Sequence, residues 1–389
     1  MIPMRIVENV KPAELDDVRR VAKLIQQDTR TAKYDLVSGI LCDDNGDAMV
    51  LPTVLESQKR VVQNWGRVPF STRRFISGVE HLVFGADFCQ KNAQQLASVQ
   101  APGGTGALRL AFDFFAQQLK GERIWIGTPC WSNYQNVAKA AGLATQFFEH
   151  TSQVEVFEQQ LVDTKPNDAL ILQSGAHNPS GSVYSSEEWQ QIAQVCRRKQ
   201  LIPIIDNASQ GLGRGVEEDS EAIRVISSIC PNLIVATSFS KNFTLYHEQV
   251  GALTIKVECE RYTRAVQEAM NGIIRSNYSS PSQFGASIVT EILGDDSLRM
   301  TWEKELMDVR SLLKQRKHAL LTSINNDKAI PTHTVYGVFF QLPLALSDIR
   351  ALRTRDAIYL LDNGRISLTG LTPRIIENVG TCIRHALLR

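Results

Sequence analysis

The sequence predicts an α/β protein with a large domain on a mainly parallel sheet and a smaller α+β domain. The chain has 389 residues, which is too long for one small hydrophobic core and favours about two domains. From about residue 100 onward, short apolar runs rich in β-branched residues alternate with helical patterns, as in parallel sheets covered by helices on both faces. After residue 280 this alternation gives way to a long helical pattern and a short mixed region.

The elements of the first part follow from local patterns. Residues 12–27 have helical spacing and an acidic first turn, which predicts a helix. Residues 34–54 read as a short strand, a turn at 44–46 and an irregular segment. A glycine-rich turn opens an amphipathic helix over 100–119, and 123–129 form the next strand.

The alternation continues through the middle of the chain. Residues 168–181 predict a strand that enters a turn. Residues 185–199 predict a helix, and the Ser185-x-x-Glu188 pattern at its start is typical of a capping box. Three further apolar runs predict strands at 201–211, 232–241 and 251–257.

The C-terminal part has a different texture. Residues 295–326 read as one long helix, either continuous or with a break, and a final helix is expected near 373–388. Between them lie two short apolar segments that favour a second, α+β domain with the N-terminal helix packed on it. We therefore place the large domain at 49–308 and the small domain at 1–48 and 309–389.

Composition excludes several classes of protein. Apolar residues make up 43% and charged residues 21%, as in a globular protein, and the net charge of +1 provides no field for nucleic acid or an anionic membrane. The seven cysteines are scattered without a CxxC pair, which favours free thiols over disulfides or a metal site. We find no signal-peptide core and no apolar run near the ~18 residues of a membrane span, and we expect a cytoplasmic protein.

Polar side chains end three of the predicted strands, namely Asn178, Asp206 and Lys241. Because ligands of open parallel sheets bind beyond the carboxyl ends of the strands, we expect these side chains to converge on one rim. Taken singly, each has an ordinary interpretation as a turn residue, a helix cap or a solvated surface cation. Together, an amide, a carboxylate and an amine suit a ring oxygen, a cationic ring nitrogen and an aldehyde, which predicts pyridoxal phosphate.

A phosphate group needs a site of its own, and the run PGGTG at 102–106 is the candidate. Glycines let backbone N–H groups approach an anion, the following helix presents its positive end, and Thr105 adds a hydroxyl donor. The run lacks the Lys-Ser/Thr of a Walker loop and does not fit GxGxxG. A plain turn remains the alternative at this position.

The order of these motifs resembles that of the aspartate and aromatic amino acid aminotransferases. These are class I, fold-type-I pyridoxal-phosphate enzymes, and the resemblance extends from about residue 10 to the C-terminus. The resemblance implies a seven-stranded sheet and a homodimer with shared active sites. The motifs that carry it are PGGTGALR, PCWSN, HNPSG, D-x-A-x-QG, SFSKNF, NYSSP and NGRISLTG.

The resemblance implies roles for the matched cofactor residues. Lys241 matches the Schiff-base lysine, which also moves the proton between the substrate Cα and the cofactor. Asp206 matches the partner of the ring nitrogen, and Asn178 matches the amide beside the ring oxygen. Trp131 matches the ring that stacks on the cofactor. The phosphate contacts match Gly103, Gly104, Thr105 and Ser238.

The resemblance also implies the substrate contacts. Arg365 matches the arginine that binds the substrate α-carboxylate, for which a planar guanidinium is suited. Gly39 lines the substrate side, as do Trp131 and Asn178. Arg275 matches the arginine that reads a second carboxylate across the dimer interface, with a solvated helix-end charge as the alternative.

Several positions depart from the family pattern. Gln249 stands where the family has a phosphate-binding arginine, and Ser209 where it has a tyrosine that reaches the ring oxygen. Tyr134 replaces a histidine behind the ring aspartate. The segment 66–78, which includes Phe70, lacks the tyrosine that reaches the neighbouring subunit's phosphate. One hypothesis is that Arg73 or Arg74, both in this segment, supplies the missing charge.

We therefore expect a homodimeric, pyridoxal-phosphate-dependent aminotransferase. It would move an amino group between an amino acid of the aspartate, glutamate or aromatic type and a 2-oxo acid. A repurposed enzyme of the same fold is the first alternative, because the same cofactor supports elimination, racemisation, decarboxylation and oxidation. The second alternative is a non-catalytic homologue that binds the cofactor weakly. No metal and no nucleic-acid partner is expected.

Overall fold

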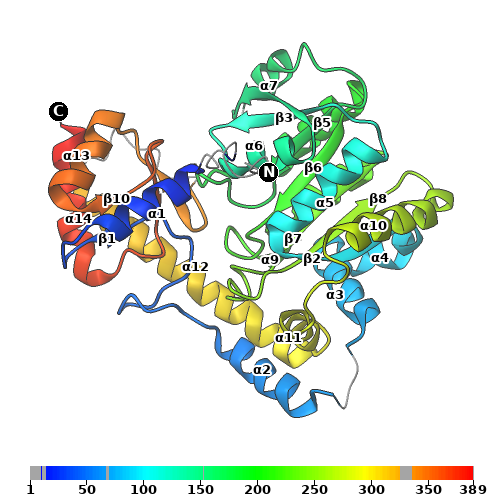
Figure 1. The fold of residues 1–389 in the computed structure, drawn as a ribbon, viewed down its shortest axis with the longest axis horizontal. Helices are drawn as coiled ribbons and strands as arrows, with labels where there is room; N and C mark the ends of the chain where they lie inside the picture. Colours follow the sequence, from blue (N-terminus) through cyan, green and yellow to red (C-terminus); the bar gives the residue numbers. More distant parts are fainter. Residues whose placement is uncertain (1–9, 11–14, 67–69, 152, 325–334, 389) are drawn as a thin grey trace, which may run out of the picture.

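A seven-stranded sheet forms the centre of the protein in the computed structural model, which describes residues 10, 15–66, 70–151, 153–324 and 335–388 (Figure 1). The strand order is β2-β8-β7-β6-β5-β3-β4; β8 runs antiparallel to both neighbours and the other pairs are parallel. The predicted mainly parallel sheet is confirmed. The strands are β2 (Leu96–Pro102), β3 (Arg123–Thr128), β4 (Ala144–Glu149), β5 (Ala169–Gln173), β6 (Ile202–Asn207), β7 (Leu233–Ser238) and β8 (Val250–Lys256).

Helices cover both faces of this sheet (Figure 1). Successive strand residues point to opposite faces, so that Ile204 packs with α5, α6 and α10 while Ile205 packs with α3, α8 and α9. This double burial explains why the central strands β5, β6 and β7 are apolar along most of their length. The helices are α3 (Thr72–Phe84), α4 (Ala86–Asn92), α5 (Gly103–Gln117), α6 (Asn133–Ala140), α7 (Val154–Gln160), α8 (Ser186–Arg198), α9 (Val216–Ile229) and α10 (Thr263–Asn277).

Local signals predicted several element boundaries correctly. The capping box of α8 is formed, since the Ser185 side chain accepts from the backbone N–H of Glu188 and the Glu188 carboxylate accepts from that of Ser185. The predicted N-terminal helix is α1 (Asp17–Gln27), and residues 12–14 of that prediction lie outside the described residues. The irregular segment at 34–54 contains β1 (Tyr34–Asp35) and then runs into α2 (Pro52–Asn64), whose first turn begins with a proline.

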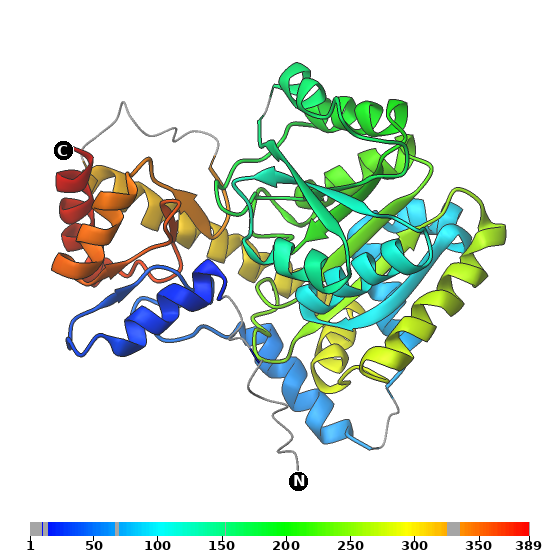
Figure 2. The same ribbon diagram turned by 45° about the horizontal axis from the view of Figure 1, so that its top comes forward.

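A second group of elements lies beside the sheet (Figure 2). It pairs β1 with β10 (Ile358–Tyr359) and β9 (Phe339–Gln341) with β11 (Arg365–Ser367). Helices α13 (Leu346–Asp356) and α14 (Pro373–Leu387) belong to the same group, and α14 packs on α12 (Asp296–Ile324). Helix α1 packs on it through Val21.

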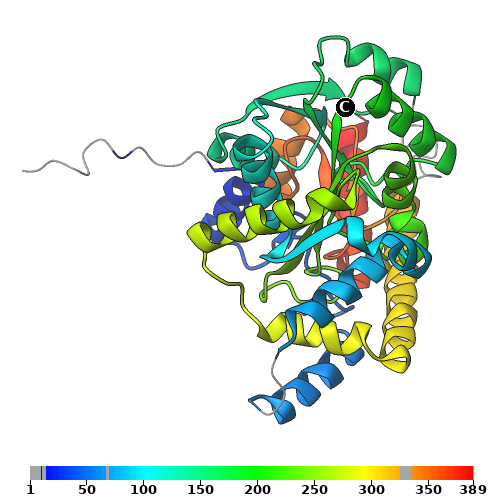
Figure 3. The same ribbon diagram turned by 90° about the vertical axis from the view of Figure 1, so that its right-hand side faces the viewer.

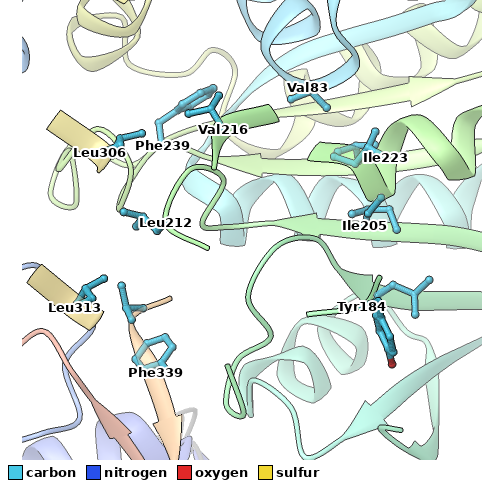
Figure 4. Packing of buried hydrophobic residues seen from close by; sticks show 14 of the residues in the cluster. Val83, Tyr184, Ile205, Leu212, Val216, Ile223, Phe239, Leu306, Leu313 and Phe339 are labelled. Atoms are coloured by element: carbon cyan, nitrogen blue, oxygen red, sulfur yellow. The ribbon is translucent and has the colours of Figure 1, made fainter. Parts of the chain in front are cut away.

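Helix α12 connects the two groups of elements. Its 29 residues are continuous, so the alternative of a break is wrong. Figure 4 shows Leu306 beside Phe239 at the sheet and Leu313 beside Phe339 in the second group. At the sheet end, α11 (Phe284–Leu293) lies against α2 and α12, with α2 and α11 side by side (Figure 3).

The domain boundary is our proposal: residues 49–308 form the large domain, and 1–48 with 309–389 form the small one.

In the part of the chain that the structure describes, no helix is both long and apolar enough to cross a membrane. Within the same residues, no three histidine, cysteine or acidic side chains gather as metal ligands would. Two short 3₁₀ helices, at Ala93–Gln95 and Glu260–Tyr262, complete the described elements.

Candidate active site

One cavity collects the residues that end the central strands. Asp206 lies at the end of β6, Asn178 and Lys241 follow the neighbouring strands β5 and β7, and all three line this cavity. The cavity has an empty volume of about 960 Å³, part of it open to solvent. The convergence expected from the strand ends is present because parallel neighbours finish at the same edge. Further predicted residues that line it are Gly104, Thr105, Trp131 and Ser238.

Asp206 is buried and has one oxygen bonded and one oxygen without a partner. Its Oδ2 accepts a hydrogen bond from the Tyr134 hydroxyl at 2.5 Å, while its Oδ1 has no partner among the described residues. Burial raises the pKa of Asp206, and the Tyr134 hydrogen bond and the Lys241 charge act against that rise. The unpaired oxygen is therefore a strong acceptor available to a donor in the cavity.

Lys241 lies in the turn after β7, with its amine in a cavity that favours the uncharged form. Burial lowers the pKa of Lys241, the Asp206 charge opposes this, and the Arg365 charge adds to it. Gly39 faces this lysine: a Cβ on Gly39 would lie 3.7 Å from the Lys241 Cε and only 2.8 Å from the Phe339 Cζ. A buried amine of lowered pKa is suited to act as a nucleophile and as a proton carrier.

The glycine-rich run forms the N-terminal turn of α5 and packs tightly on its surroundings. A Cβ on Gly103, whose φ is +70°, would lie 2.6 Å from the Gln249 Oε1. A Cβ on Gly104 would lie 2.8 Å from the Ser238 Cβ. The other end of the Gln249 amide donates to the carbonyl of Tyr246 at 2.7 Å. The run therefore brings a helix N-terminus to the cavity, where only glycines fit.

Arg365 reaches the site from the second group of elements. It is 3% exposed, and it donates to the Asn178 Oδ1 at 3.1 Å and to the Val37 carbonyl at 2.8 Å. Its guanidinium carbon lies 4.0 Å from the centre of the Phe339 ring, and its Nε has no partner in the described structure. Burial lowers the pKa of Arg365 to about 10, so the side chain remains a cation at neutral pH.

None of the four predicted arginines lines this cavity, and Arg365 is connected to it through its hydrogen bond to Asn178. Arg275 is exposed in the last turn of α10, where it donates to the Ser279 hydroxyl at 2.5 Å. Arg73 is exposed on α3, and Arg74 lines a separate cavity between α2 and α11. Among the described residues that line the active-site cavity, Lys241 is the only cationic side chain.

Sequence reasoning missed two histidines, of which His177 is buried and lines the cavity and His150 is half-buried. The rings of His150 and His177 stack with centroids 3.8 Å apart. His150 bonds to the Tyr184 hydroxyl at 3.0 Å and to the Ser182 hydroxyl at 3.0 Å, and His177 bonds to Ser180 at 2.8 Å. Burial lowers the pKa of His150 to about 4 and lowers that of His177 as well. The motif HNPSG contains His177, but no pattern in the sequence pairs it with His150.

The half-buried His150 predicts acid sensitivity of the fold. The unfolded chain protonates this imidazole below about pH 6.5, whereas the folded protein does so only near pH 4. The unfolded state therefore binds more protons over this range, and stability falls as the pH is lowered. We expect His150 to remove about 2 kcal/mol between pH 7 and pH 5. In thermal melts, His150→Gln should show a smaller drop across this range, and the exposed His318→Gln should behave like wild type. Equal drops in all three proteins would contradict this expectation.

The comparisons with known proteins identify the family. The sequence profile described as "Aminotransferase class I and II" matches residues 31–381. The chain belongs to the class I and II aminotransferase family. The family predicted from the sequence motifs is therefore confirmed, and the chain is an aminotransferase.

Relatives of this aminotransferase match it over nearly their full length. It is 32% identical to an aspartate aminotransferase of Salmonella typhi over 381 residues, covering 94% of this chain and 96% of the relative. It is 33% identical to a tyrosine aminotransferase of Rhizobium meliloti over 374 residues, covering 92% and 94%.

Solved structures share the whole fold of this aminotransferase. One is the aspartate aminotransferase from Saccharomyces cerevisiae cytoplasm, with a TM-score of 0.92, 26% identity and 98% of each chain covered. Another is an aromatic-amino-acid aminotransferase from Burkholderia pseudomallei covalently bound to pyridoxal phosphate, with a TM-score of 0.92, 26% identity, and 99% and 100% covered. The predicted fold, with its seven-stranded sheet, is thereby confirmed.

Proposed function

We propose that this aminotransferase uses pyridoxal phosphate to move an amino group between an amino acid and a 2-oxo acid. Aspartate, glutamate and the aromatic amino acids are the proposed donors. The observation that carries the proposal is the meeting of Lys241, Asp206 and Asn178 in one cavity, with Arg365 bonded to Asn178. The named activities of the relatives support the same substrates.

The residues of the cavity fit pyridoxal phosphate. The unpaired Oδ1 of the buried Asp206 is suited to a ring N–H donor, and the Lys241 amine would hold the cofactor covalently. When bound, the cofactor supplies an electron sink for the negative charge that develops at the substrate Cα. Lys241 then carries the proton to and from that carbon. Asn178 would lie at the ring oxygen and Trp131 over the ring.

The phosphate end of the proposed site is polar but uncharged. Backbone N–H groups at the start of α5, with Gly103 and Gly104 in its first turn, would hold the phosphate, helped by the hydroxyls of Thr105 and Ser238. Gln249 lines the same end and is neutral. A cofactor site that departs from the family pattern at Gln249 is therefore part of the proposal. Arg73 or Arg74 of a second subunit is our candidate for the missing charge.

Restoring the arginine should tighten cofactor binding. Gln249→Arg would place a cation beside Gly103, and charge-assisted bonds to phosphate are worth roughly 1.5–3 kcal/mol each. We therefore expect the Kd for pyridoxal phosphate to fall about tenfold or more, measured by fluorescence titration of cofactor-free protein. Gln249→Met is the neutral control and should not tighten binding. An unchanged Kd in Gln249→Arg would contradict a charge deficit at this position.

The substrate side combines two subunits in our proposal. Arg365, Asn178, Trp131 and Gly39 would surround the amino acid, with the α-carboxylate on Arg365. Arg275 lies away from the cavity of its own chain, so we propose that it reads a second carboxylate in the neighbouring subunit of a homodimer. We also propose a cytoplasmic location, which the sequence analysis led us to expect.

A labelling experiment tests the function. The protein with pyridoxal phosphate is incubated with ¹⁵N-aspartate or ¹⁵N-tyrosine and 2-oxoglutarate, and the products are followed by mass spectrometry. Transfer of the label to glutamate is the expected result. Release of the label as ammonia, or loss of CO₂, would support instead the repurposed enzyme that Ser209 and Gln249 favour. Absence of turnover with no bound cofactor would support the non-catalytic homologue.

A further inference from the structure

Tyr134 makes the contact that holds the Asp206 carboxylate. It is the second residue of α6, it is 1% exposed, and its hydroxyl donates to the Asp206 Oδ2 at 2.5 Å. The Oδ1 is left without a partner in the described structure. A hydrogen bond to one oxygen restricts the rotation of a carboxylate, and so favours one direction for its free oxygen.

The same phenol also supports Trp131. The two rings meet edge to face, with centroids 5.2 Å apart and an interplanar angle of 89°. Trp131 itself is half-buried and lines the active-site cavity. Tyr134 thus contacts both Asp206, which would bond to the ring nitrogen of the cofactor, and Trp131, which would stack on the ring. Tyr134 itself does not line the cavity.

Given the proposed function, we propose that Tyr134 is a positioning residue that holds Asp206 for the ring nitrogen of the cofactor. It bonds one carboxylate oxygen, leaves the other free, and keeps its own proton while doing so. A phenol in this place gives a donor whose charge stays constant where an imidazole would titrate. The proposal predicts that Tyr134 adds no titration of its own to the pairing of Asp206 with the ring near neutral pH.

The surroundings of the pair support this constancy. Burial and the Asp206 charge raise the pKa of Tyr134, so the phenol stays protonated. Lys241 faces Asp206, and its amine would be taken up by the cofactor. Cys130 faces Tyr134, and burial raises the pKa of its thiol to about 11.

Three further titratable groups lie across a small cavity beside Tyr134, namely His150, His177 and Tyr184. Burial lowers the pKa of both histidines and raises that of Tyr184. All three shifts favour the uncharged forms near neutral pH. The pair consequently has uncharged neighbours across this small cavity.

Two variants test the proposal. Tyr134→Phe removes the hydroxyl and keeps the ring against Trp131, and Tyr134→His restores a donor that titrates. The first readout needs no cofactor: the carboxyl infrared band of Asp206 is followed against pH in cofactor-free protein, with Asp206→Asn to assign it. In Tyr134→Phe, the Asp206 carboxylate should become protonated at a higher pH than in wild type, because it loses a hydrogen bond that stabilises its charged form. The second readout is the Kd for pyridoxal phosphate, which should rise about tenfold or more in Tyr134→Phe.

The third readout is the pH dependence of cofactor binding. We expect the ratio of the Kd of Tyr134→His to that of wild type to change between pH 5.5 and pH 8, because only the imidazole titrates at position 134 in this range. An Asp206 band and a Kd unaltered in Tyr134→Phe would overturn the positioning role. Failure of wild type to bind the cofactor would overturn the proposed function, while the infrared titration would still decide whether Tyr134 holds Asp206. Melting temperatures identify any variant that fails to fold.

Discussion

Lys241→Ala is expected to abolish transamination. Lys241 is the only cationic side chain among the described residues that line the active-site cavity, and the charges of Asp206 and Arg365 both act on the pKa of its amine. Its removal deletes both the covalent attachment point and the proton carrier. Proton transfer by a positioned side chain contributes roughly 10²–10⁴-fold, so kcat should fall at least that far. The measurement is single-turnover conversion of amino acid to 2-oxo acid.

The controls separate chemistry from folding. Lys139→Ala removes an exposed lysine from α6, close to the site in the chain but outside the cavity, and should keep full activity. Borohydride reduction of the wild-type protein with pyridoxal phosphate should label the peptide that contains Lys241, and Lys241→Ala should leave no label there. Residual activity within tenfold of wild type in Lys241→Ala would mean that another group carries the proton.

Arg365→Leu is expected to reduce kcat/KM for every amino acid substrate by about 10²–10⁴-fold, since a bidentate guanidinium–carboxylate contact contains two charge-assisted bonds. The geometry supports this role, because Arg365 is buried, cationic and rigidly held by Asn178 and the Val37 carbonyl. Its unpaired Nε leaves donor capacity for a ligand. Steady-state kinetics with aspartate and tyrosine measure the effect.

Arg365→Lys is the matched variant for this prediction. It keeps the charge but loses the planar fork, so its kcat/KM should fall less than that of Arg365→Leu. Both variants should bind pyridoxal phosphate with nearly the wild-type Kd, since Arg365 is proposed to contact only the substrate. A loss of cofactor affinity that parallels the loss of kcat/KM would assign Arg365 a structural role instead.

The residues at the carboxyl ends of the central strands could be predicted from the sequence, because their position depends only on where each strand ends and on the parallel direction of the strands. Asn178, Asp206 and Lys241 each follow an apolar run, and adjacent parallel strands present their carboxyl ends at one edge. The glycine-rich turn could be predicted for a similar reason, since only glycine tolerates the close approach of Gln249 and Ser238.

Contacts between distant segments could not be predicted in this way. The bond from Tyr134 to Asp206 depends on how α6 docks against β6, so no local pattern specifies it, and only the family resemblance placed Tyr134 behind Asp206. The stacking of His150 on His177 joins the end of β4 to the loop after β5. The role proposed for Arg275 depends on a second chain, which lies beyond any single-chain pattern.

Two helical regions were predicted incompletely from the sequence, namely α12 and the stretch that contains α2, α3 and α4. The buried positions of α12 recur every three or four residues from Leu298 to Ile324, which is the pattern of one continuous helix. Helices α2, α3 and α4 occupy a stretch to which the sequence reading assigned almost nothing. In α2, Val62 is 58% exposed and Trp65, just after the helix, is 55% exposed, so the apolar periodicity there is weak.

The absorption spectrum during a half-reaction tests the central claim most directly. The purified protein is saturated with pyridoxal phosphate, an amino donor such as glutamate is added, and the 2-oxo acid is quantified alongside the spectrum. We predict that the band of the lysine-bound cofactor disappears, that the band of its amine form replaces it, and that one 2-oxoglutarate is released per active site. A cofactor band that forms but does not convert with aspartate, glutamate or any aromatic donor would contradict the account.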